Sequence, residues 1–215
     1  MEMAGSEPTQ LNLGISTFYS KYYLPRILPV VKHELPNVKL NVIEDISQNL
    51  EDMVLGNVLD FCMVPTPLEH RELMTTPLVV ERILLAFPPD HALLKKYPES
   101  ESVPLHEVRN EPFVFLRQRQ RFTKMGMDMC EEAGFRPKIV YETMSWDTVD
   151  AIIAKGVGVG FVPELVVNIP SETKPHYRRI SSCNDSRDYM LAYMSDQLKR
   201  KTGKEFIALI ERTMR

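Results

Sequence analysis

The sequence predicts an α/β fold with a parallel sheet, in which the same alternation of strands and helices occurs twice. Three observations predict it. Short segments in which apolar residues alternate with polar ones, or run unbroken, are typical of strands. Between them, apolar residues recur at helical spacing, and glycines follow the ends of several helical segments. Strands that alternate with helices along a chain form a mostly parallel sheet covered by those helices.

The first strand and helix are predicted at the start of the patterned sequence. Residues 11–15 alternate between apolar and polar or small side chains, as a strand does. A helix is expected from Ser16 or Thr17, either of which can cap it, to about His33. Two prolines, Pro25 and Pro29, lie inside this helix and predict an irregular first half.

The next two strands enclose a second helix. Residues 38–44 predict a strand, and Ser47 stands where the N-cap of the following helix belongs. Gly56-Asn57 is expected to end that helix. The run 58–64 is apolar apart from Asp60, which predicts a buried parallel strand.

A second round of elements follows a strand over residues 78–87. Two helices in it are closed by glycines, Gly134 and Gly156, and a loose stretch from Asn168 to Asp188 precedes the final pair of elements. We predict strands over 112–116, 139–141, 157–162 and 189–194, and helices over 122–133, 146–155 and 202–214.

The composition is that of a globular protein and excludes some classes of function. Of 215 residues, 44% are hydrophobic and 26% charged, which allows one domain or two lobes of about 100 residues each. The formal net charge of −3 builds no field of the kind that non-specific nucleic-acid binding needs, so DNA contacts would have to come from another segment. No stretch is long and apolar enough for a membrane span, and no signal peptide opens the chain.

The three cysteines indicate a reduced compartment rather than a metal site or a disulfide framework. Cys62, Cys130 and Cys183 are widely spaced and odd in number, and no CxxC pair or Cys/His cluster is present. Cys62 lies in an apolar run and is expected to be buried. We therefore expect a cytoplasmic protein with no metal and no cofactor.

No pattern predicts catalysis. The histidines at 33, 70, 91, 106 and 176 are scattered, and none has a nucleophile at a recognisable spacing. The glycines at 156, 158 and 160 follow a helix and enter a strand, the reverse of the order that a dinucleotide-binding loop requires. We expect no catalytic residues, and hence a protein that is not an enzyme.

Candidate ligand-binding residues follow from the architecture. In α/β sheets, ligands bind beyond the carboxyl ends of the strands, where helix N-termini present free N–H groups. In the first round these positions are Ser16, Thr17, Ser47, Pro65 and Thr66, whose hydroxyls and backbone amides suit a carboxylate, phosphate or amide. The alternative is that the serines and threonines are only N-caps.

In the second round, the same rule selects the segment after Phe115. Arginines at 117, 119 and 121 leave a buried strand and enter a helix, and they can present planar forks to an anion. Arg117 is nearest the strand end; the alternative is a solvated loop. Thr143, Met144 and Ser145 follow the next strand, while Trp146 is expected in the core. An aromatic ligand would suit Phe115, Met144 and Trp146 equally well.

Several phrases of the sequence, in order, resemble the effector-binding domain of LysR-type transcriptional regulators. The most specific is Gly156 to Pro163, which is similar to a Gly-x-Gly-x-x-x-x-Pro phrase of that family; Ala92 stands where the family usually has proline. The other matching phrases are Leu13-Gly14-Ile15, Leu24-Pro25, Leu28-Pro29, Leu35-Pro36-Asn37-Val38, Glu44, Ser47, Leu50 to Gly56, Leu59-Asp60, Asp90-His91-Ala92-Leu93 and Ala133-Gly134-Phe135 with Pro137.

The resemblance implies a periplasmic-binding-protein-like fold of type 2, with two lobes joined by two crossover hinge strands. The crossovers would lie near Ala86-Phe87 and Tyr189-Met190. Residues 1–10 would be a linker or remnant, residues 11–86 plus 190–215 lobe I, and residues 87–189 lobe II. The winged helix-turn-helix that precedes this region in the family is absent from the sequence.

The resemblance also implies a function and a mode of assembly. A small-molecule effector would bind between the lobes, where the matching positions line the family's cleft, and so control transcription; the arginines suggest an anion. A homodimer or tetramer would form through the helices at about 17–33 and 202–214, with DNA bound only by the missing N-terminal domain. Interface candidates are Leu24, Ile27, Leu28 and Val31, for which a place in the core of one chain is equally consistent.

Two other functions fit the same fold. A solute-binding protein for transport would be distinguished by being a monomer, since regulator domains associate. An enzyme related to binding proteins would need a catalytic Cys, Lys or carboxylate at the ligand site, and Cys62 lies within an apolar run.

Overall fold

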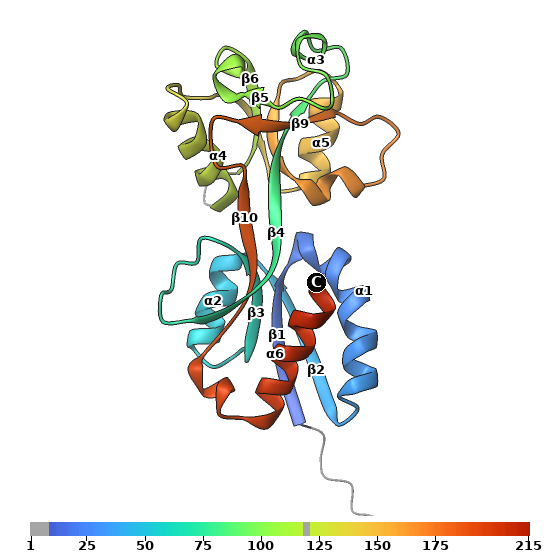
Figure 1. The fold of residues 1–215 in the computed structure, drawn as a ribbon, viewed down its shortest axis with the longest axis vertical. Helices are drawn as coiled ribbons and strands as arrows, with labels where there is room; N and C mark the ends of the chain where they lie inside the picture. The colour runs from blue at the N-terminus through green and yellow to red at the C-terminus, as the bar shows by residue number, and fades with distance from the viewer. Residues whose placement is uncertain (1–8, 118–120) are drawn as a thin grey trace, which may run out of the picture. The chain divides into compact units, whose positions relative to one another are not determined.

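The structure, a computed structural model, describes residues 9–117 and 121–215 and divides into two compact units (Figure 1). Unit 1 comprises Met1–Val80 and Asp188–Arg215, and unit 2 comprises Glu81–Arg187. The chain passes between the units on two strands, β4 (Met74–Phe87) and β10 (Ser186–Tyr193). The crossovers expected near Ala86-Phe87 and Tyr189-Met190 lie on these same two strands.

Unit 1 is built on a sheet in the order β2-β1-β3-β10. Strand β1 (Thr9–Ser16) is parallel to β2 (Val38–Asp45) and to β3 (Phe61–Pro65), and β10 runs antiparallel to β3. Parallel pairing is the arrangement that the alternation of strands and helices predicted. It brings the carboxyl ends of β1, β2 and β3 to one edge of the sheet.

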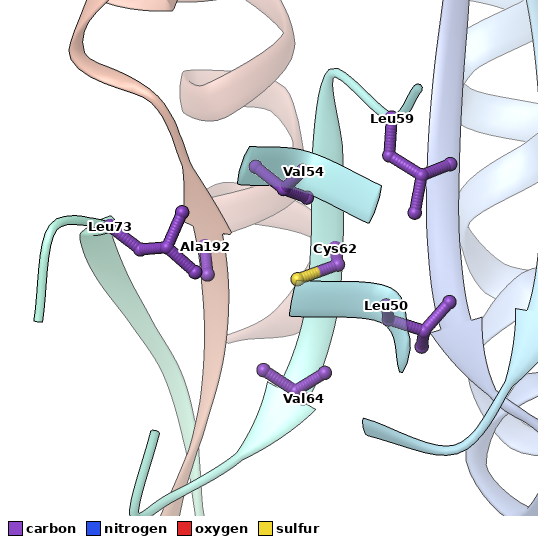
Figure 2. Packing of buried hydrophobic residues seen from close by; sticks show 7 residues of the cluster. All are labelled: Leu50, Val54, Leu59, Cys62, Val64, Leu73 and Ala192. Atoms are coloured by element: carbon purple, nitrogen blue, oxygen red, sulfur yellow. The ribbon is translucent and has the colours of Figure 1, made fainter. Parts of the chain in front are cut away.

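Three helices cover this sheet. Helix α2 (Ser47–Leu55) packs Leu50 and Val54 against Cys62 and Val64 of β3, as Figure 2 shows. The ring of Phe61, the neighbour of Cys62, lies 4.8 Å from that of Phe206 in α6 (Lys201–Met214). Because successive side chains of a strand point to opposite faces, α2 and α6 cover opposite faces of the sheet.

Helix α1 (Thr17–Glu34) lies beside α6. The Arg26 guanidinium donates to the carbonyl of Thr213 over 3.1 Å, and Arg212 pairs with Glu34. Pro25 and Pro29 do not interrupt α1, contrary to our expectation of an irregular first half. Both prolines are exposed, so the carbonyls that lose their helical donors lie toward solvent.

Unit 2 has a core of aromatic rings. Phe113 and Phe115 of β6 (Pro112–Leu116) pack against Phe161 of β8 (Gly160–Pro163), with ring centroids 5.8 and 5.9 Å away. The remaining elements of the unit are α3 (Leu93–Lys96), β5 (Val103–Pro104), η1 (Leu105–Val108), α4 (Arg121–Glu132), β7 (Lys138–Thr143), α5 (Trp146–Ala154), η2 (Glu164–Asn168) and β9 (His176–Ser181). Unit 1 also holds the 3₁₀ helix η3 (Ser195–Leu198).

The strands of unit 2 pair in two groups. Strands β8 and β9 both run antiparallel to β4, and β5 adds to β9, while β6 and β7 form a separate parallel pair. The glycine run allows the first group to approach the second. A Cβ atom at Gly158 would lie 2.3 Å from the carbonyl oxygen of Pro112, so no side chain fits there.

The predicted elements are present, with differences at several boundaries. Gly134 and Gly156 have φ of +84° after their helices, as expected of C-terminal glycines, whereas after α2 the positive φ belongs to Asn57 and not to Gly56. Strand β3 begins at Phe61 and leaves Val58 exposed. Strand β1 begins at Thr9, inside the segment expected to be a linker.

Strand β9 was missed, because it lies in the stretch that we expected to be loose. Its sequence carries two arginines, of which Arg178 is buried. The guanidinium of Arg178 donates from Nε to the carbonyl of Tyr97 and from Nη1 to that of Tyr177, both over 2.9 Å. A buried arginine satisfied by carbonyls does not produce the apolar alternation from which strands are predicted.

Candidate functional site

In unit 1, the first candidates lie where β1 passes into α1. Ser16 occupies the N-cap position of α1, as predicted, but its hydroxyl makes no capping hydrogen bond. Its Oγ is buried and has no hydrogen-bond partner within the described residues. Thr17, the first residue of the helix, is exposed. The simple capping role is therefore not the one that Ser16 performs in this structure.

Ser47 is not the N-cap of α2, and that prediction was wrong. The N-cap is Ile46, and Ser47 is the first helical residue. The polar group at this helix start is Asp45, whose Oδ1 accepts hydrogen bonds from the backbone N–H of Ile46 (2.7 Å) and from Nδ2 of Asn49 (2.9 Å). A carboxylate before the helix satisfies a free donor as a serine would, and it leaves the Ser47 side chain half-buried at the same edge.

The end of β3 is tied to β10. Pro65 is buried, and Thr66 after it exchanges two hydrogen bonds with Asp188: the Thr66 N–H donates to the Asp188 carbonyl (2.8 Å), and the Asp188 N–H donates to Thr66 Oγ1 (3.0 Å). The Thr66 hydroxyl keeps its own proton for another acceptor. Register places Ser16 beside Asp45, so the unit 1 candidates lie along one sheet edge.

In unit 2, the structure brings three predicted residues together at the ends of β6 and β7. The Arg117 N–H donates to the carbonyl of Thr143 over 2.7 Å, and the Arg117 Nη1 atom lies 4.0 Å from the sulfur of Met144. Arg117 is exposed, and the Met144 side chain is 63% exposed. A guanidinium, a hydroxyl and an apolar thioether thus share one surface, which we call the Arg117 site (Arg117, Thr143, Met144 and Ser145).

The start of α5 completes the Arg117 site. Ser145 is the N-cap residue, its side chain makes no capping bond, and its N–H donates to Thr143 Oγ1 over 3.4 Å. Asp147 adds a carboxylate in the first turn. The cationic group of the site is therefore the Arg117 guanidinium, while the helix N-terminus contributes backbone dipoles already shared with an acidic residue.

The other two arginines of the segment, Arg119 and Arg121, are not among the residues that make up the Arg117 site. Arg119 lies outside the described residues, and Arg121, the first residue of α4, is half-buried. Sequence reasoning missed Thr123, which is buried and donates from Oγ1 to the carbonyl of Leu116 over 2.9 Å. This bond fixes the end of β6 to α4, and a threonine in the first turn of a helix was the signal available for it.

Two aromatic candidates are part of the unit 2 interior. Phe115 is buried against Phe161, so its ring belongs to the core. Trp146 is buried, as expected, and its ring meets that of Phe122 edge-on at 4.5 Å.

The four interface candidates on α1 separate into two pairs. Ile27 and Val31 are buried in the core of unit 1, whereas Leu24 is half-buried and Leu28 is 40% exposed. Among these four, Leu28 presents the most apolar surface to solvent.

Buried groups that titrate are found in unit 2. Burial raises the pKa of the Cys130 thiol to about 12, and burial also raises that of Cys183. Asp150 is 1% exposed; the Tyr177 hydroxyl donates to its Oδ1 over 2.6 Å, and its Oδ2 has no hydrogen-bond partner in the described part of the chain. Burial raises the pKa of Asp150, and the Tyr177 hydrogen bond opposes this rise.

Residues 9–117 and 121–215 contain neither a membrane-spanning helix nor a metal-binding cluster. No helix in these ranges is both long and apolar enough to cross a membrane. Within the same ranges, no three histidine, cysteine, aspartate or glutamate side chains gather in a way that would hold a metal ion.

Comparison with known proteins gives a consistent result. A family model described as the LysR substrate binding domain matches residues 4–215. The uncharacterized HTH-type transcriptional regulator YcgK of Bacillus subtilis is 26% identical over 96% of the chain and 67% of its own length. The hydrogen peroxide-inducible genes activator of Haemophilus influenzae is 24% identical over 89% of the chain and 64% of its own length. The chain spans between 50% and 67% of the length of the first four curated relatives that it matches.

Solved structures agree with the fold. The C-terminal domain of a probable LysR family transcriptional regulator from Rhodococcus sp. RHA1 matches with a TM-score of 0.81 at 22% identity, covering 94% of this chain and 98% of that one. The BenM effector binding domain with its effector benzoate matches with a TM-score of 0.81 at 16% identity, covering 97% and 91%. The fold is the periplasmic-binding-protein-like fold of type 2.

Proposed function

The chain belongs to the family of LysR substrate-binding domains, and from this premise we propose that it senses a small molecule as the regulatory part of a LysR-type transcriptional regulator. The observation that carries this proposal is the Arg117 site, where exposed polar groups from two strand ends gather at a helix start. Ser16, Thr17, Ser47, Pro65 and Thr66 in unit 1 remain candidates for ligand contacts.

We propose a small organic anion as the effector. The planar Arg117 guanidinium suits a carboxylate or phosphate, and the exposed Met144 side chain offers an apolar surface beside it. One structural relative is described with benzoate, an aromatic carboxylate, as its effector. An anion with an apolar body would use both halves of the site.

The whole protein would act on DNA through a segment beyond this chain. The relatives are named as HTH-type regulators, and they are longer than the chain. Together with a net charge of −3, this supports DNA binding outside residues 1–215. We further propose a cytoplasmic protein that acts as a homodimer or a higher oligomer.

We propose that the chain binds its effector without transforming it. The curated relatives are regulators rather than enzymes or transport receptors, which favours sensing over both alternatives.

Thiol oxidation is a second way in which such a protein can sense, since several relatives are named as peroxide-inducible activators. Peroxide reacts with the thiolate, and a raised pKa keeps a thiol protonated at neutral pH. Cys62 and Cys130 are buried, and the pKa values of Cys130 and Cys183 are raised. These features favour effector binding over oxidation of the cysteines.

Thermal unfolding in the presence of benzoate, acetate, inorganic phosphate and glucose tests the proposal. Benzamide, which has the shape of benzoate without its charge, is the control compound. An anion at 100 times its dissociation constant stabilises the fold by about 2.7 kcal/mol, a clear rise in Tm.

Arg117→Ala should weaken binding of that anion about tenfold or more, because a charge-assisted hydrogen bond is lost. Arg136→Ala, which removes the same charge from another exposed position of unit 2, should leave the Tm rise intact. An equal response to benzamide, an unchanged response in Arg117→Ala, or no response to any anion would each contradict an anion held by Arg117.

A further inference from the structure

A buried ion pair joins the two strands that connect the units. Glu81 on β4 and Arg187 on β10 are the first and last residues of unit 2. The Arg187 Nε atom lies 2.7 Å from Glu81 Oε2, and the two side chains are 6% and 4% exposed. Both strands are therefore fastened to each other at the point where each one enters unit 2.

Stability alone does not account for this pair. Moving two charges out of water costs several kcal/mol, so apolar residues of similar size are often as stable as a buried ion pair. What an ion pair adds is a fixed geometry, because leaving either charge without its partner is strongly unfavourable. The pair thus holds β4 and β10 in one arrangement.

The guanidinium also contacts the helix that follows β6. Its central carbon lies 4.8 Å from the centroid of the Phe122 ring, a cation–π arrangement. Phe122 in turn meets Trp146 edge-on, with the centroids 4.5 Å apart. Phe122 is the second residue of α4 and Trp146 the first residue of α5. A continuous set of contacts therefore runs from β4 and β10 to the starts of both helices.

These helix starts border the Arg117 site. Trp146 follows Ser145 directly, and Thr123, next to Phe122, holds the carbonyl of Leu116, the residue before Arg117. A ligand that moves the strand ends must move the first turns of α4 and α5 with them.

The contacts of β10 indicate where a movement of these helix starts would change the connecting strands. Asp188, the neighbour of Arg187, is held by its two hydrogen bonds with Thr66 in unit 1. Arg187 and Asp188 are neighbours in the sequence, but Arg187 is held by a residue of unit 2 and Asp188 by a residue of unit 1. On β4, Val80 precedes Glu81 and is 67% exposed, so little packing restrains it. The unit boundaries at 80–81 and 187–188 are therefore the positions at which we expect such a movement to bend the connecting strands.

We propose that Glu81, Arg187, Phe122 and Trp146 form a coupling cluster that transmits the state of the Arg117 site to the bending points of β4 and β10. This role rests on the proposed function, since it explains how ligand binding at the Arg117 site would affect the connecting strands. The role requires arginine: a planar guanidinium can lie over a ring while it donates to a carboxylate, whereas a lysine ammonium is a point charge.

Hydrogen exchange of the whole chain tests the coupling cluster without any ligand. Trp146→Phe disturbs the helix start, and exchange is followed in peptides covering residues 78–88 and 183–190. The Ile83 N–H, which donates to the Asp185 carbonyl over 2.7 Å, reports directly on the link between the two strand segments. We expect exchange there to rise roughly two- to tenfold, the size of one aromatic contact.

The same substitution is then made in a chain that carries Glu81→Met and Arg187→Met. This pair of changes removes both charges together and keeps apolar volume against Phe122, so we expect the fold to be retained. In that background, Trp146→Phe should no longer change exchange in the two strand peptides. Phe135→Leu, which removes a different aromatic contact of unit 2, should leave these peptides unchanged in both backgrounds.

An effect of Trp146→Phe that is equal in both backgrounds, or absent from both, would overturn the proposal. If the double methionine chain does not fold, Arg187→Lys replaces it: the charge remains, and loss of the Trp146→Phe effect supports a role for the planar group, while a full effect overturns it. Because no ligand is used, failure of this test leaves the Tm response to anions standing, and the reverse also holds.

Discussion

At the scale of single residues, Asp150 gives unit 2 a buried carboxyl group with only one oxygen satisfied. The Tyr177 hydroxyl donates to Oδ1, and Oδ2 has no hydrogen-bond partner among the described residues. Burial raises the pKa of Asp150 above its ordinary value of 3.8. The folded state therefore holds the proton more tightly than the unfolded state does. Its contribution to stability is complete below pH 3.8 and is lost as the pH rises through the folded pKa.

Asp150→Asn should remove this loss. Asparagine keeps an oxygen to accept from Tyr177 and does not ionise, so the variant should gain stability over the natural chain as the pH rises from 3.8 through the folded pKa. Urea unfolding at a series of pH values measures the difference. Asp128→Asn, at an exposed position on α4, is the control and should show no comparable gain. A difference that stays constant with pH would show that Asp150 does not titrate as described.

At the scale of elements, the carboxylate of Asp60, directly before β3, connects several elements of unit 1. Its Oδ2 accepts from the backbone N–H of Asn12 in β1 (2.9 Å), and its Oδ1 accepts from Gln197 in η3 (3.0 Å) and from Arg200 (2.9 Å). One carboxylate thus ties the strands of unit 1 to the segment that leads into α6.

Asp60→Ala should destabilise the chain by about 3 kcal/mol, because three donors lose a charged partner and two of the contacts are partly buried. Denaturant unfolding measures this cost. Asp52→Ala, which breaks the more exposed pair with His70, should cost less than about 1 kcal/mol. Equal costs for the two substitutions would mean that Asp60 does not hold these elements together.

Helices and strands were predicted correctly where the local sequence is enough to determine the backbone conformation. They were missed where the conformation depends on a contact with a residue elsewhere in the chain. Gly134 and Gly156 mark helix ends because their φ of +84° favours glycine in any surroundings. Ser47 misled because Asp45, two residues earlier, takes the role at the helix start. Strand β9 was hidden because Arg178 is satisfied by the carbonyl of Tyr97, far away in the sequence.

The candidate site was predicted to a similar extent. The rule that ligands bind beyond strand ends selected Arg117, Thr143 and Met144, which the structure brings together. It selected Phe115 as well, although the last residues of a buried strand still face the core. Thr123 and the Glu81–Arg187 pair were not found, because their roles depend on partners that only the folded chain brings near.

At the scale of the whole molecule, the exposed Leu28 on α1 supports association of two copies through this helix. We predict that Leu28→Glu abolishes the proposed association, which sedimentation would measure, and changes the unfolding free energy of the monomer by no more than about 0.5 kcal/mol. Val157→Glu, at an exposed apolar position of unit 2, should leave association unchanged. A Leu28→Glu chain that sediments as the natural chain does would show that α1 is not the interface.

Trp146 has a photophysical consequence. It is the only tryptophan of the 215 residues, and its indole stands edge-on to Phe122 at the first residue of α5. Selectively excited emission therefore originates from one known place, beside the Arg117 site. The indole is buried, so its emission should be blue-shifted, and any rearrangement that admits water should move it to the red. The chain carries its own optical reporter, and no dye has to be attached to watch that helix start.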